Sequence, residues 1–399
     1  MFDREENPSG VTEASIVVGL ASYNEADSIA FPTEQAGIGL KQYYGHRKSV
    51  ILNCDNHSPD GTKDAFMSAQ TEAPKIYITT PPDTPGKGYN FENMFRKALE
   101  LKADVLICLD ADLLSITPKW IKYFAEPVFE GHDFVSPVYS RHKYDGTITN
   151  NICFPIVYGL FCKNIRQPIG GDFALSQRLT QHLLCQPWHR TTEEYGIDIF
   201  MTMNAILGGF KTCDTGLGAK IHKPSAPKLG PMFVQVVRTA FLTVVRYLEK
   251  WKDLSDIEES KLYGLRKLER PQDLTIDRND IEKQAREGFA QSQSILEKSL
   301  STDLYASLSK MYSGGKIDVT SDQWAIAVYD MINAFSLSEN RDEIVESLKG
   351  LYFGRTLSFM NQTWDLSNDD AEEEIMAQAN IFYARRGYLI GKLESGNKN

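Results

Sequence analysis

The chain has no closely spaced C-x-x-C cysteine pair, no long apolar run and no excess of positive charge. Its cysteines, at positions 54, 108, 153, 162, 185 and 213, include no C-x-x-C pair. Reduced thiols in the core are therefore expected instead of a zinc site or a disulfide framework. The net charge of −10 argues against a main role in binding nucleic acid, although an acidic chain can bind an anion where a metal ion or local cations supply positive charge.

The sequence also lacks the patterns of a signal peptide and of a membrane span. Residues 1–6 are acidic and polar, unlike the start of an exported protein. The most apolar helical stretch, residues 232–248, is interrupted by Gln235, Arg238 and Arg246, which favours a core helix. We therefore expect a cytoplasmic protein with no membrane span.

No internal repeat is present, and 42% of the 399 residues are hydrophobic, so a packed core is expected. In the first half, short apolar runs alternate with helical periodicity. Strands are expected over residues 16–20, 50–55, 76–78 and 105–109 and from 134, and helices near 26–40, from 61, over 91–99 and from 118, after an N-cap at Thr117. This alternation predicts an α/β fold, Rossmann-like, with a mostly parallel sheet and helices on both faces.

The pattern changes after about residue 230, where long helical periodicities dominate and no strand is convincing. Residues 266–282 are charged and contain Pro271, which is typical of an exposed connection. We therefore predict an α/β catalytic domain over residues 1–230 and a helical C-terminal domain over residues 231–399. The helical domain is expected to pack on the sheet, and a homodimer formed through it stays open.

Asp110-Ala111-Asp112 is the central chemical signal, because two carboxylates follow directly after a buried strand. Ligands bind at the carboxyl edge of open α/β sheets, and paired carboxylates there can hold a hard cation that bridges a diphosphate. The alternative is a turn whose Asp residues cap a helix. Glu25 and Asp55, after the first and second strands, are candidates to bind a nucleoside, or else to cap the helices that follow.

Lys87 stands between two glycines just before a helix, a favourable place for phosphate; the alternative is a solvated lysine in a flexible turn. The Gly-Lys-Ser/Thr of a Walker loop is missing. Residues 167–173 place two glycines before an expected helix start, where Asp172 would be the N-cap or the backbone would approach a sugar. Asp198 is a candidate to orient an acceptor hydroxyl or act as its base, or to complement a helix dipole. His222 is a candidate third metal ligand or an ordinary histidine.

Pro-Gly-Lys-Gly, Asp-Ala-Asp, Gln-Pro-Ile-Gly-Gly-Asp and Tyr-Gly-Ile-Asp occur in this order. Together they resemble the retaining GT-A glycosyltransferases that make compatible solutes, namely mannosylglycerate synthase and the glucosylglycerate and glucosyl-3-phosphoglycerate synthases. The resemblance runs from residue 16 to about 224 and continues more weakly around Trp324 and residues 355–357. It implies a GT-A fold, Mg²⁺ or Mn²⁺, and transfer of glucose or mannose from a GDP- or UDP-linked donor to D-glycerate or a similar small carboxylate, with retention.

The resemblance also implies a role for individual residues. Glu25, Asp55, Lys87, Asp110 and Ala111 are expected to bind the nucleotide-sugar, and Asp110, Asp112 and His222 the metal. The main chain at Ile169 is expected to face the anomeric carbon, and Asp198 to orient the acceptor hydroxyl. Arg141 and Thr149 are similar to residues that hold the glycerate carboxylate, a task that suits the planar guanidinium of arginine.

One departure from the family concerns the acceptor. The phosphoglycerate enzymes carry a Gly-Gly-Gly-Arg-Val-Thr stretch for the acceptor phosphate, whereas residues 154–160 here contain no arginine. This favours glycerate, with glucosyl-3-phosphoglycerate synthesis as the alternative. An inverting GT-A enzyme with Asp198 as general base, a nucleotidyltransferase and a non-catalytic scaffold are further alternatives. A nucleotidyltransferase usually has a Gly-rich loop after the first strand, and Ser22-Tyr23-Asn24-Glu25 is not such a loop. A non-catalytic scaffold would not need the complete set of Asp, Lys and His residues.

Overall fold

The computed structural model describes residues 3–221, 223, 229–265, 271, 274 and 276–396. The chain divides into two compact units. We call the first the sheet unit; it comprises Met1–Ser140, Ile165–Leu229 and Ser260–Pro271. We call the second the helical unit; it comprises Arg141–Asn164, Gly230–Glu259 and Gln272–Asn399.

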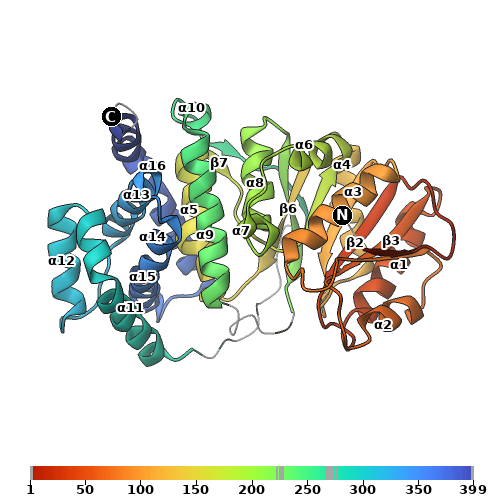
Figure 1. The fold of residues 1–399 in the computed structure, drawn as a ribbon, viewed down its shortest axis with the longest axis horizontal. Coiled ribbons are helices and arrows are strands. Elements are labelled where there is room, and N and C mark those ends of the chain that lie inside the picture. Colours follow the sequence, from red (N-terminus) through yellow and green to blue (C-terminus); the bar gives the residue numbers. More distant parts are fainter. Residues whose placement is uncertain are drawn as a thin grey trace. The chain divides into compact units, whose positions relative to one another are not determined.

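The sheet unit is built on a nine-stranded sheet in the order β1-β4-β3-β2-β5-β8-β6-β9-β11 (Figure 1). The strands are β1 (Arg4–Glu6), β2 (Ile16–Ser22), β3 (Ser49–Asp55), β4 (Lys75–Thr79), β5 (Val105–Asp110), β6 (Phe134–Ser140), β8 (Phe173–Ser176), β9 (Thr212–Ala219) and β11 (Leu262–Gly264). Only two strands run against the others: β1 at one edge, and β8 between β5 and β6. The predicted α/β class with a mostly parallel sheet is confirmed.

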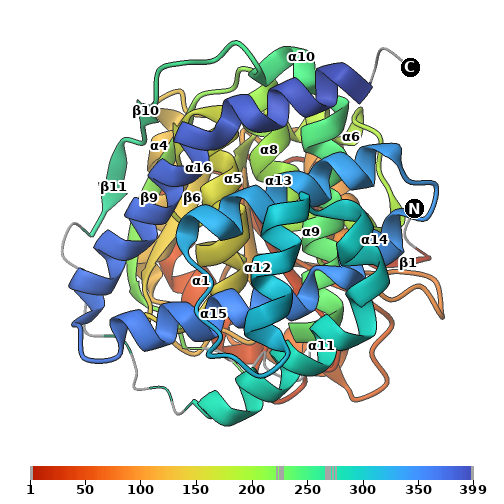
Figure 2. The same ribbon diagram turned by 90° about the vertical axis from the view of Figure 1, so that its left-hand side faces the viewer.

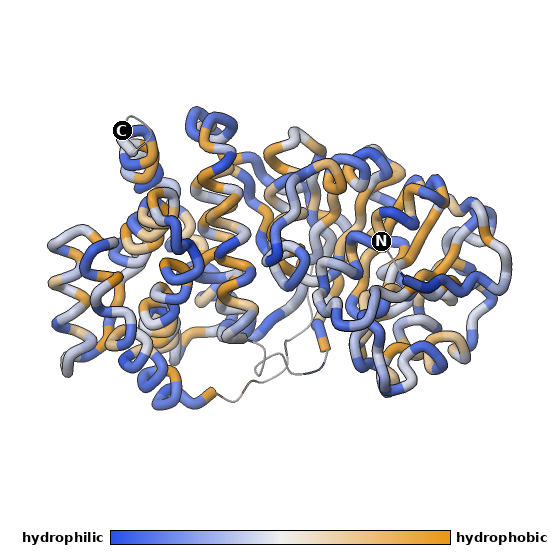
Figure 3. Tube along the Cα trace, in the orientation of Figure 1, coloured by the Kyte–Doolittle hydropathy of each residue, from blue (hydrophilic) through white to orange (hydrophobic). Residues whose placement is uncertain are grey.

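Helices cover both faces of this sheet. They are α1 (Ala30–Tyr44), α2 (Thr62–Ser68), α3 (Lys87–Glu100), α4 (Pro118–Phe129), α6 (Gln177–Leu184), α7 (Arg190–Glu193) and α8 (Ile197–Leu207). Successive residues of a strand point to opposite faces, so Val18 packs in one buried cluster with Trp120 of α4, and Val17 in another with Phe95 of α3. The strands are accordingly apolar along much of their length, as the hydropathy colouring shows (Figure 3).

The helices and strands expected between residue 16 and the strand that begins at residue 134 are all present, most of them with shifted ends. The helix expected near residues 26–40 begins at Ala30 and ends at Tyr44. The helix expected over residues 91–99 begins earlier, at Lys87. Pro118 occupies the start of α4 as predicted, but the Thr117 side chain makes no capping hydrogen bond.

The helical unit is dominated by helices, as predicted for the C-terminal half. They are the π-helix η1 (Thr149–Cys153), α5 (Phe154–Phe161), α9 (Leu229–Arg246), α10 (Leu248–Trp251), α11 (Arg278–Ser299), α12 (Thr302–Tyr312), α13 (Ser321–Leu337), α14 (Arg341–Ser347), α15 (Lys349–Thr363) and α16 (Asn368–Gly396). The long helix α16 runs beside α5 and α13, and α11 runs beside α15 (Figure 2). Strands β7 (Lys163–Asn164) and β10 (Glu258–Glu259) form a parallel pair.

The division between the units differs from a single cut at residue 230. Helix α5 is apolar along its whole length and all its residues are buried, so it needs other helices to cover it. Residues just before and within it bond to the C-terminal helices: Trp324 Nε1 donates to the Asn151 carbonyl oxygen at 2.7 Å, and Tyr158 bonds Asn380 at 2.9 Å. Near residue 262 the chain returns to the sheet unit as β11, where no strand was expected.

The other predictions about composition can be checked directly. All six cysteines are free thiols; five are buried and Cys185 is exposed, as expected for reduced core residues. In the stretch over residues 232–248, α9 ends at Arg246 and α10 begins at Leu248. Within the described ranges, no helix combines the length and the apolarity that crossing a bilayer requires.

Candidate active site

The carboxyl ends of three adjacent parallel strands bring the predicted residues to one edge of the sheet. Ser22 at the end of β2 pairs with Asp55 at the end of β3, and Ala21 pairs with Asp110 at the end of β5. Asp110-Ala111-Asp112, called the DAD motif below, therefore lies beside the ends of β2 and β3, where open α/β sheets bind their ligands.

Asp110 is held by two lysines that come from distant parts of the chain. Its Oδ1 lies 2.9 Å from Lys87 Nζ, at the start of α3, and its Oδ2 lies 2.8 Å from Lys220 Nζ, just after β9. Burial alone would raise the pKa of this carboxyl, but the two ammonium groups outweigh burial and hold the pKa well below its usual range. Asp110 is therefore a carboxylate with both oxygens engaged.

Lys87 connects Asp110 to Asp198, the residue predicted to act on the acceptor. Asp198 lies in the first turn of α8, with its Oδ1 3.3 Å from Lys87 Nζ. Burial opposes the charge of Lys87, but the two carboxylates raise its pKa above the ordinary value. The pKa of Asp198 is raised, because burial and the nearby charge of Asp110 outweigh the attraction of Lys87 and Lys220.

The Gly170-Gly171 turn lies directly against these ion pairs. Lys220 Nζ donates to the Gly170 carbonyl oxygen at 2.9 Å, and Lys87 Nζ to that of Gly171 at 3.4 Å. Gly171 has φ +95°, and a Cβ at this position would lie 2.6 Å from Asp110 Oδ2. Glycine is therefore favoured here, and the predicted approach of this backbone to a sugar stays a prediction.

The prediction that a helix starts after these glycines is wrong, because strand β8 follows instead. Asp172 is therefore no N-cap. Its fully buried carboxylate accepts from the Asp110 backbone N–H at 2.8 Å, from Lys220 Nζ at 2.8 Å and from the Tyr139 hydroxyl. It locks the DAD motif to the turn, a role that spacing along the sequence did not show.

The segment that carries Ile169 is fixed by Gln167, the first residue of the Gln-Pro-Ile-Gly-Gly-Asp motif, and by Tyr139 and Thr202, which the sequence did not single out. Gln167 donates through Nε2 to the Tyr139 carbonyl oxygen at 2.8 Å and accepts from the Tyr139 backbone N–H at 3.2 Å. Thr202, one turn after Asp198 on α8, donates to the Pro168 carbonyl oxygen at 2.6 Å. The Ile169 main chain is thus held between β6 and α8. For Thr202, the signal in the sequence was a polar residue between two methionines.

The two predicted nucleoside residues have different surroundings. Asp55 is fully buried and accepts hydrogen bonds from Ser22 Oγ at 2.9 Å, Ser58 Oγ at 2.6 Å and the Tyr77 hydroxyl at 2.9 Å. Its carboxylate organises the loops after β2 and β3. Glu25 is less enclosed and lies 2.7 Å from Lys223 Nζ.

The other members of the predicted metal and nucleotide group lie after β5. Ala111 is buried in the core of the sheet unit, and its role in binding the nucleotide-sugar stays a prediction. Asp112 Oδ2 accepts from the Lys223 backbone N–H at 3.3 Å. His222 lies outside the described residues, and the described ranges alone contain no group of three His, Cys, Asp or Glu side chains placed to hold a metal ion.

The predicted acceptor residues Arg141 and Thr149 belong to the helical unit and lie close to one another. Arg141 Nη1 is 3.4 Å, and Thr149 Oγ1 3.7 Å, from the point where a Cβ on Gly146 would stand. Thr149 opens the π-helix η1, a distortion that is frequent at functional sites. Arg141 also lies 3.5 Å from the Asp145 carboxylate. The structure therefore places this pair near Gly146, and their shared role in binding an acceptor stays a prediction.

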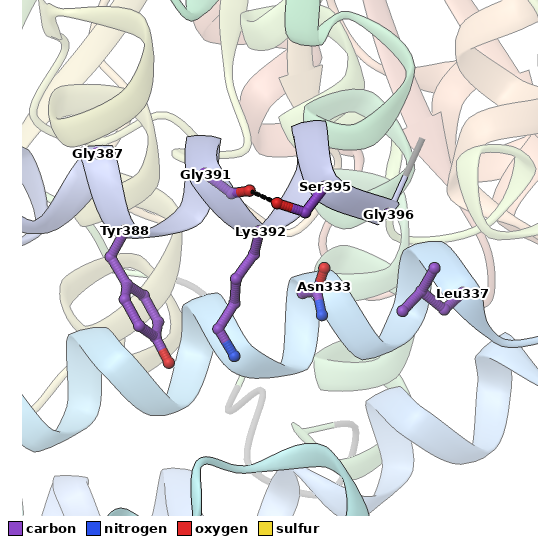
Figure 4. A pocket seen from close by; sticks show the side chains of 8 residues that line it. All are labelled: Asn333, Leu337, Gly387, Tyr388, Gly391, Lys392, Ser395 and Gly396. Carbon is purple, nitrogen blue, oxygen red and sulfur yellow. Dashed lines mark hydrogen bonds between the residues drawn. The ribbon is translucent and has the colours of Figure 1, made fainter. Parts of the chain in front are cut away.

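An open groove of about 520 Å³ lies between α13 and α16 in the helical unit (Figure 4). It is lined by Asn333, Leu337, Gly387, Tyr388, Gly391, Lys392, Ser395 and Gly396. None of the predicted site residues lines it.

Comparisons with known proteins agree with the motifs. Residues 74–222 match the family of mannosylglycerate synthase glycosyltransferase (GT) domains. A curated relative, the glucosyl-3-phosphoglycerate synthase of Mycolicibacterium paratuberculosis, is 24% identical over 212 residues, which are 47% of this chain and 61% of the relative. The chain thus spans less than two thirds of that relative's length. The family resemblance drawn from the motifs is confirmed.

Crystal structures of glucosyl-3-phosphoglycerate synthase from Mycobacterium tuberculosis are also among the matches. The complex with Mn²⁺, UDP and glucosyl-3-phosphoglycerate is 21% identical with a TM-score of 0.48, over 58% of this chain and 80% of that chain. The complex with Mg²⁺ and UDP is 22% identical with a TM-score of 0.47, over 58% of this chain and 79% of that chain.

Proposed function

We propose that this chain, which is related through residues 74–222 to the GT-A glycosyltransferases of the mannosylglycerate synthase type, transfers glucose or mannose from a GDP- or UDP-linked sugar to D-glycerate or a similar small carboxylate. The observation that carries the proposal is the ion-pair chain from Asp110 through Lys87 to Asp198 at the carboxyl edge of the sheet. Transfer from a nucleotide-sugar needs a cation for the diphosphate beside a polar group for the attacking hydroxyl. Lys87 would supply the cation, and Asp198 the polar group.

Lys87 is the residue proposed to bind the diphosphate. Its ammonium stands at the first residue of α3, where helix N–H groups favour an anion. The side chain is 16% exposed, so a ligand can reach it. Because Asp110 and Asp198 both keep it charged, Lys87 can donate to phosphate oxygens without first gaining a proton.

The carboxylates around Lys87 fit a divalent cation. Asp110, Asp172 and Asp198 face two lysines, and Asp112 adds another acid, so negative charge is in excess. Mg²⁺ and Mn²⁺ prefer such oxygen ligands. We propose that Asp112 and His222 are ligands of the metal ion. Asp110 would lie beside them and keep its ion pairs with Lys87 and Lys220. The cation would neutralise charge on the departing nucleoside diphosphate.

The position of Asp198 favours retention over inversion. Asp198 lies 3.3 Å from Lys87. With the diphosphate on Lys87, as proposed, Asp198 would stand on the leaving-group side of the anomeric carbon. An inverting enzyme needs its base on the opposite side, whereas a front-face reaction brings the acceptor hydroxyl to the same side. Asp198 would accept a hydrogen bond from that hydroxyl, and the main chain at Ile169 would face the positive charge that develops on the sugar.

The acceptor is proposed to be bound through its carboxylate by Arg141 and Thr149. Glycerate is favoured over 3-phosphoglycerate because α5, which covers the segment where the phosphoglycerate enzymes carry an arginine, contains only uncharged, buried residues. A dianionic phosphate without a cation partner would be costly to bury.

The test is a screen of GDP- and UDP-linked glucose and mannose against D-glycerate and 3-phosphoglycerate, with Mg²⁺ or Mn²⁺. We expect one donor to give a glycosylglycerate whose anomeric configuration, read by NMR, matches that of the donor. An inverted product would favour Asp198 as a general base. Binding of a nucleotide-sugar without transfer to any acceptor would favour a non-catalytic scaffold.

A further inference from the structure

Lys220 is a nearly buried lysine that the proposed chemistry leaves unused. Its side chain is 4% exposed, and its ammonium lies over the Tyr139 ring at 5.1 Å. Taking a charged ammonium out of water is costly unless carboxylates and hydrogen bonds compensate it. At this position the compensation comes from Asp110 and Asp172, each at 2.8 Å, and from the Gly170 carbonyl oxygen at 2.9 Å.

The partners of Lys220 come from segments that are distant along the chain. Asp110 ends β5, Gly170 and Asp172 precede β8, and Lys220 itself follows β9. Strands β5 and β8 are neighbours, but β9 lies beyond β6. A single ammonium therefore fastens the DAD motif to the turn that carries the Ile169 main chain.

The backbone of the Gly170-Gly171 turn lies directly against the Lys220–Asp110 ion pair. A Cβ on Gly171 would lie 2.7 Å from Lys220 Nζ as well as 2.6 Å from Asp110 Oδ2, so no other residue fits without displacing the turn. The absence of a side chain at Gly171 therefore allows the turn to contact the Lys220–Asp110 ion pair.

Lys87 and Lys220 differ in what a ligand can reach. Lys87 is four times as exposed, at 16% against 4%. When a diphosphate binds Lys87, Asp110 and Asp172 still need a cation to balance their charge. Lys220 already forms ion pairs with both. Lys220 can therefore keep the turn in position while Lys87 changes partners.

We propose that Lys220 is a positioning residue that holds the Gly170-Gly171 turn, and with it the Ile169 main chain, at a fixed place relative to Asp110 during transfer. This inference rests on the proposed function for its kinetic consequence. Its structural consequence, an ordered turn, can be measured in the free protein without any substrate.

The experiment compares Lys220→Met and Lys220→Arg with Lys97→Met. Lys97 is a matched control, because it is also buried in the sheet unit and pairs with two carboxylates, Glu5 at 2.7 Å and Glu100 at 2.8 Å. Hydrogen–deuterium exchange over residues 167–173 should rise at least tenfold in Lys220→Met. It should stay near wild type in Lys220→Arg, which keeps the charge, and in Lys97→Met.

The kinetic arm separates positioning from binding and from general damage. Lys220→Met should lower kcat at least about 30-fold while the donor Kd, measured by calorimetry, changes less than about fivefold; Lys220→Arg should recover most of kcat. Unchanged exchange over residues 167–173 would overturn the inference even if no transfer activity is found. A loss of donor affinity equal to the loss of kcat would overturn it too, because Lys220 would then be a binding residue.

A second variant keeps the inference testable if Lys220→Met fails to fold. Asp172→Asn preserves side-chain volume and removes one of the two carboxylates that hold Lys220. It should raise exchange over residues 167–173 and lower kcat more than donor affinity. Wild-type exchange and wild-type kcat in Asp172→Asn would contradict the proposal.

Discussion

Lysine placement decides what each carboxylate at the sheet edge can do. Asp110 has both oxygens in ion pairs, whereas Asp198 shares one of those lysines and has a raised pKa. Chemically identical side chains thus take different roles: the first organises the site, and the second stands where an acceptor hydroxyl can meet it. Residue-level predictions follow from which partner each side chain would lose.

Replacing Lys87 should weaken donor binding. Lys87→Ala removes a charge-assisted hydrogen bond worth about 1.5–3 kcal/mol, so the donor Kd should rise by about one to two decades. Calorimetry with the active donor measures this. Lys97→Ala, on the same helix but paired with Glu5 and Glu100, should leave the Kd unchanged. An unchanged Kd in Lys87→Ala would return Lys87 to a purely structural role.

Removing the metal or its main proposed ligand should abolish transfer. EDTA should stop the reaction, and Mg²⁺ or Mn²⁺ should restore it. Asp112→Ala should fold normally and lose Mn²⁺ binding, measured by electron paramagnetic resonance, together with nearly all activity. Asp104→Ala is the control, because Asp104 is exposed just before β5, at the end of the strand opposite to Asp112, where it accepts a hydrogen bond from Ser15. Full activity in EDTA would refute the metal assignment.

Asp214 on β9 should make stability depend on pH. Burial raises the pKa of Asp214 to about 7, against hydrogen bonds from Ser260 and the Arg166 backbone that lower it. As pH rises from about 4 to about 7, the unfolded chain releases this proton and the folded chain keeps it, so the free energy of unfolding falls.

Asp214→Asn should therefore gain stability as pH rises, by at most about 4 kcal/mol for a shift of roughly three pKa units. Urea unfolding at pH 5 and pH 8 measures the difference. Asp133→Asn should instead lose the same amount of stability at both pH values, because Arg178 and Ser176 outweigh burial and lower the pKa of Asp133, which leaves it ionised in the folded and the unfolded chain over this range. A gain for Asp214→Asn that is equal at both pH values would show that ionisation is not its cause.

At the scale of elements, the start of α3 depends on its packing against the segment around α7. Gly88 donates its backbone N–H to the Glu194 carbonyl oxygen at 3.0 Å, and a Cβ at Gly88 would overlap the Thr192 carbonyl oxygen. This contact fixes the helix end that carries Lys87 and places it near Asp198, which opens the next helix.

Gly88→Ala should consequently cost about 1–3 kcal/mol of stability and also weaken donor binding, because the helix end must move. Thermal unfolding and calorimetry measure the two effects. Gly391→Ala in α16 is the control: a Cβ there meets no atom within 4 Å, so stability should stay level or rise by up to about 1 kcal/mol. A wild-type Tm for Gly88→Ala would contradict the packing argument.

At the scale of the whole molecule, the residues proposed for the donor diphosphate and for the acceptor carboxylate belong to different units. Lys87 and Asp110 are in the sheet unit, as is Asp198, which is proposed for the acceptor hydroxyl, whereas Arg141 and Thr149 are in the helical unit. Changes at Arg141 should therefore affect binding of the acceptor carboxylate selectively.

Arg141→Ala should raise the KM for D-glycerate at least about tenfold and change the KM for the donor little, since only the acceptor carboxylate loses its partner. Steady-state kinetics with each substrate varied in turn gives both constants. Lys143→Ala, a nearby cation that donates to the Thr363 carbonyl oxygen at 2.7 Å, tests another source of charge. A preference of the wild-type protein for 3-phosphoglycerate, lost in Lys143→Ala, would show that Lys143 supplies a phosphate site.

The sequence by itself determined the α/β part of the fold and the edge at which the candidate site lies. Apolar runs such as residues 105–109 report burial locally, and their alternation with helices implies parallel strands. Parallel strands place their carboxyl ends at one edge, so Asp55 and Asp110 could be placed together before any contact was known.

Only the tertiary structure decided which charges pair. Two glycines followed by Asp172 looked like a helix start, because that local pattern serves a cap as well as a turn into a strand. Strand β8 runs antiparallel between β5 and β6, and this insertion brings Asp172 to the Asp110 backbone and to Lys220. Lys220 lies 110 residues from Asp110, and contacts at that separation depend on how the strands are ordered in the sheet, which local periodicity does not encode.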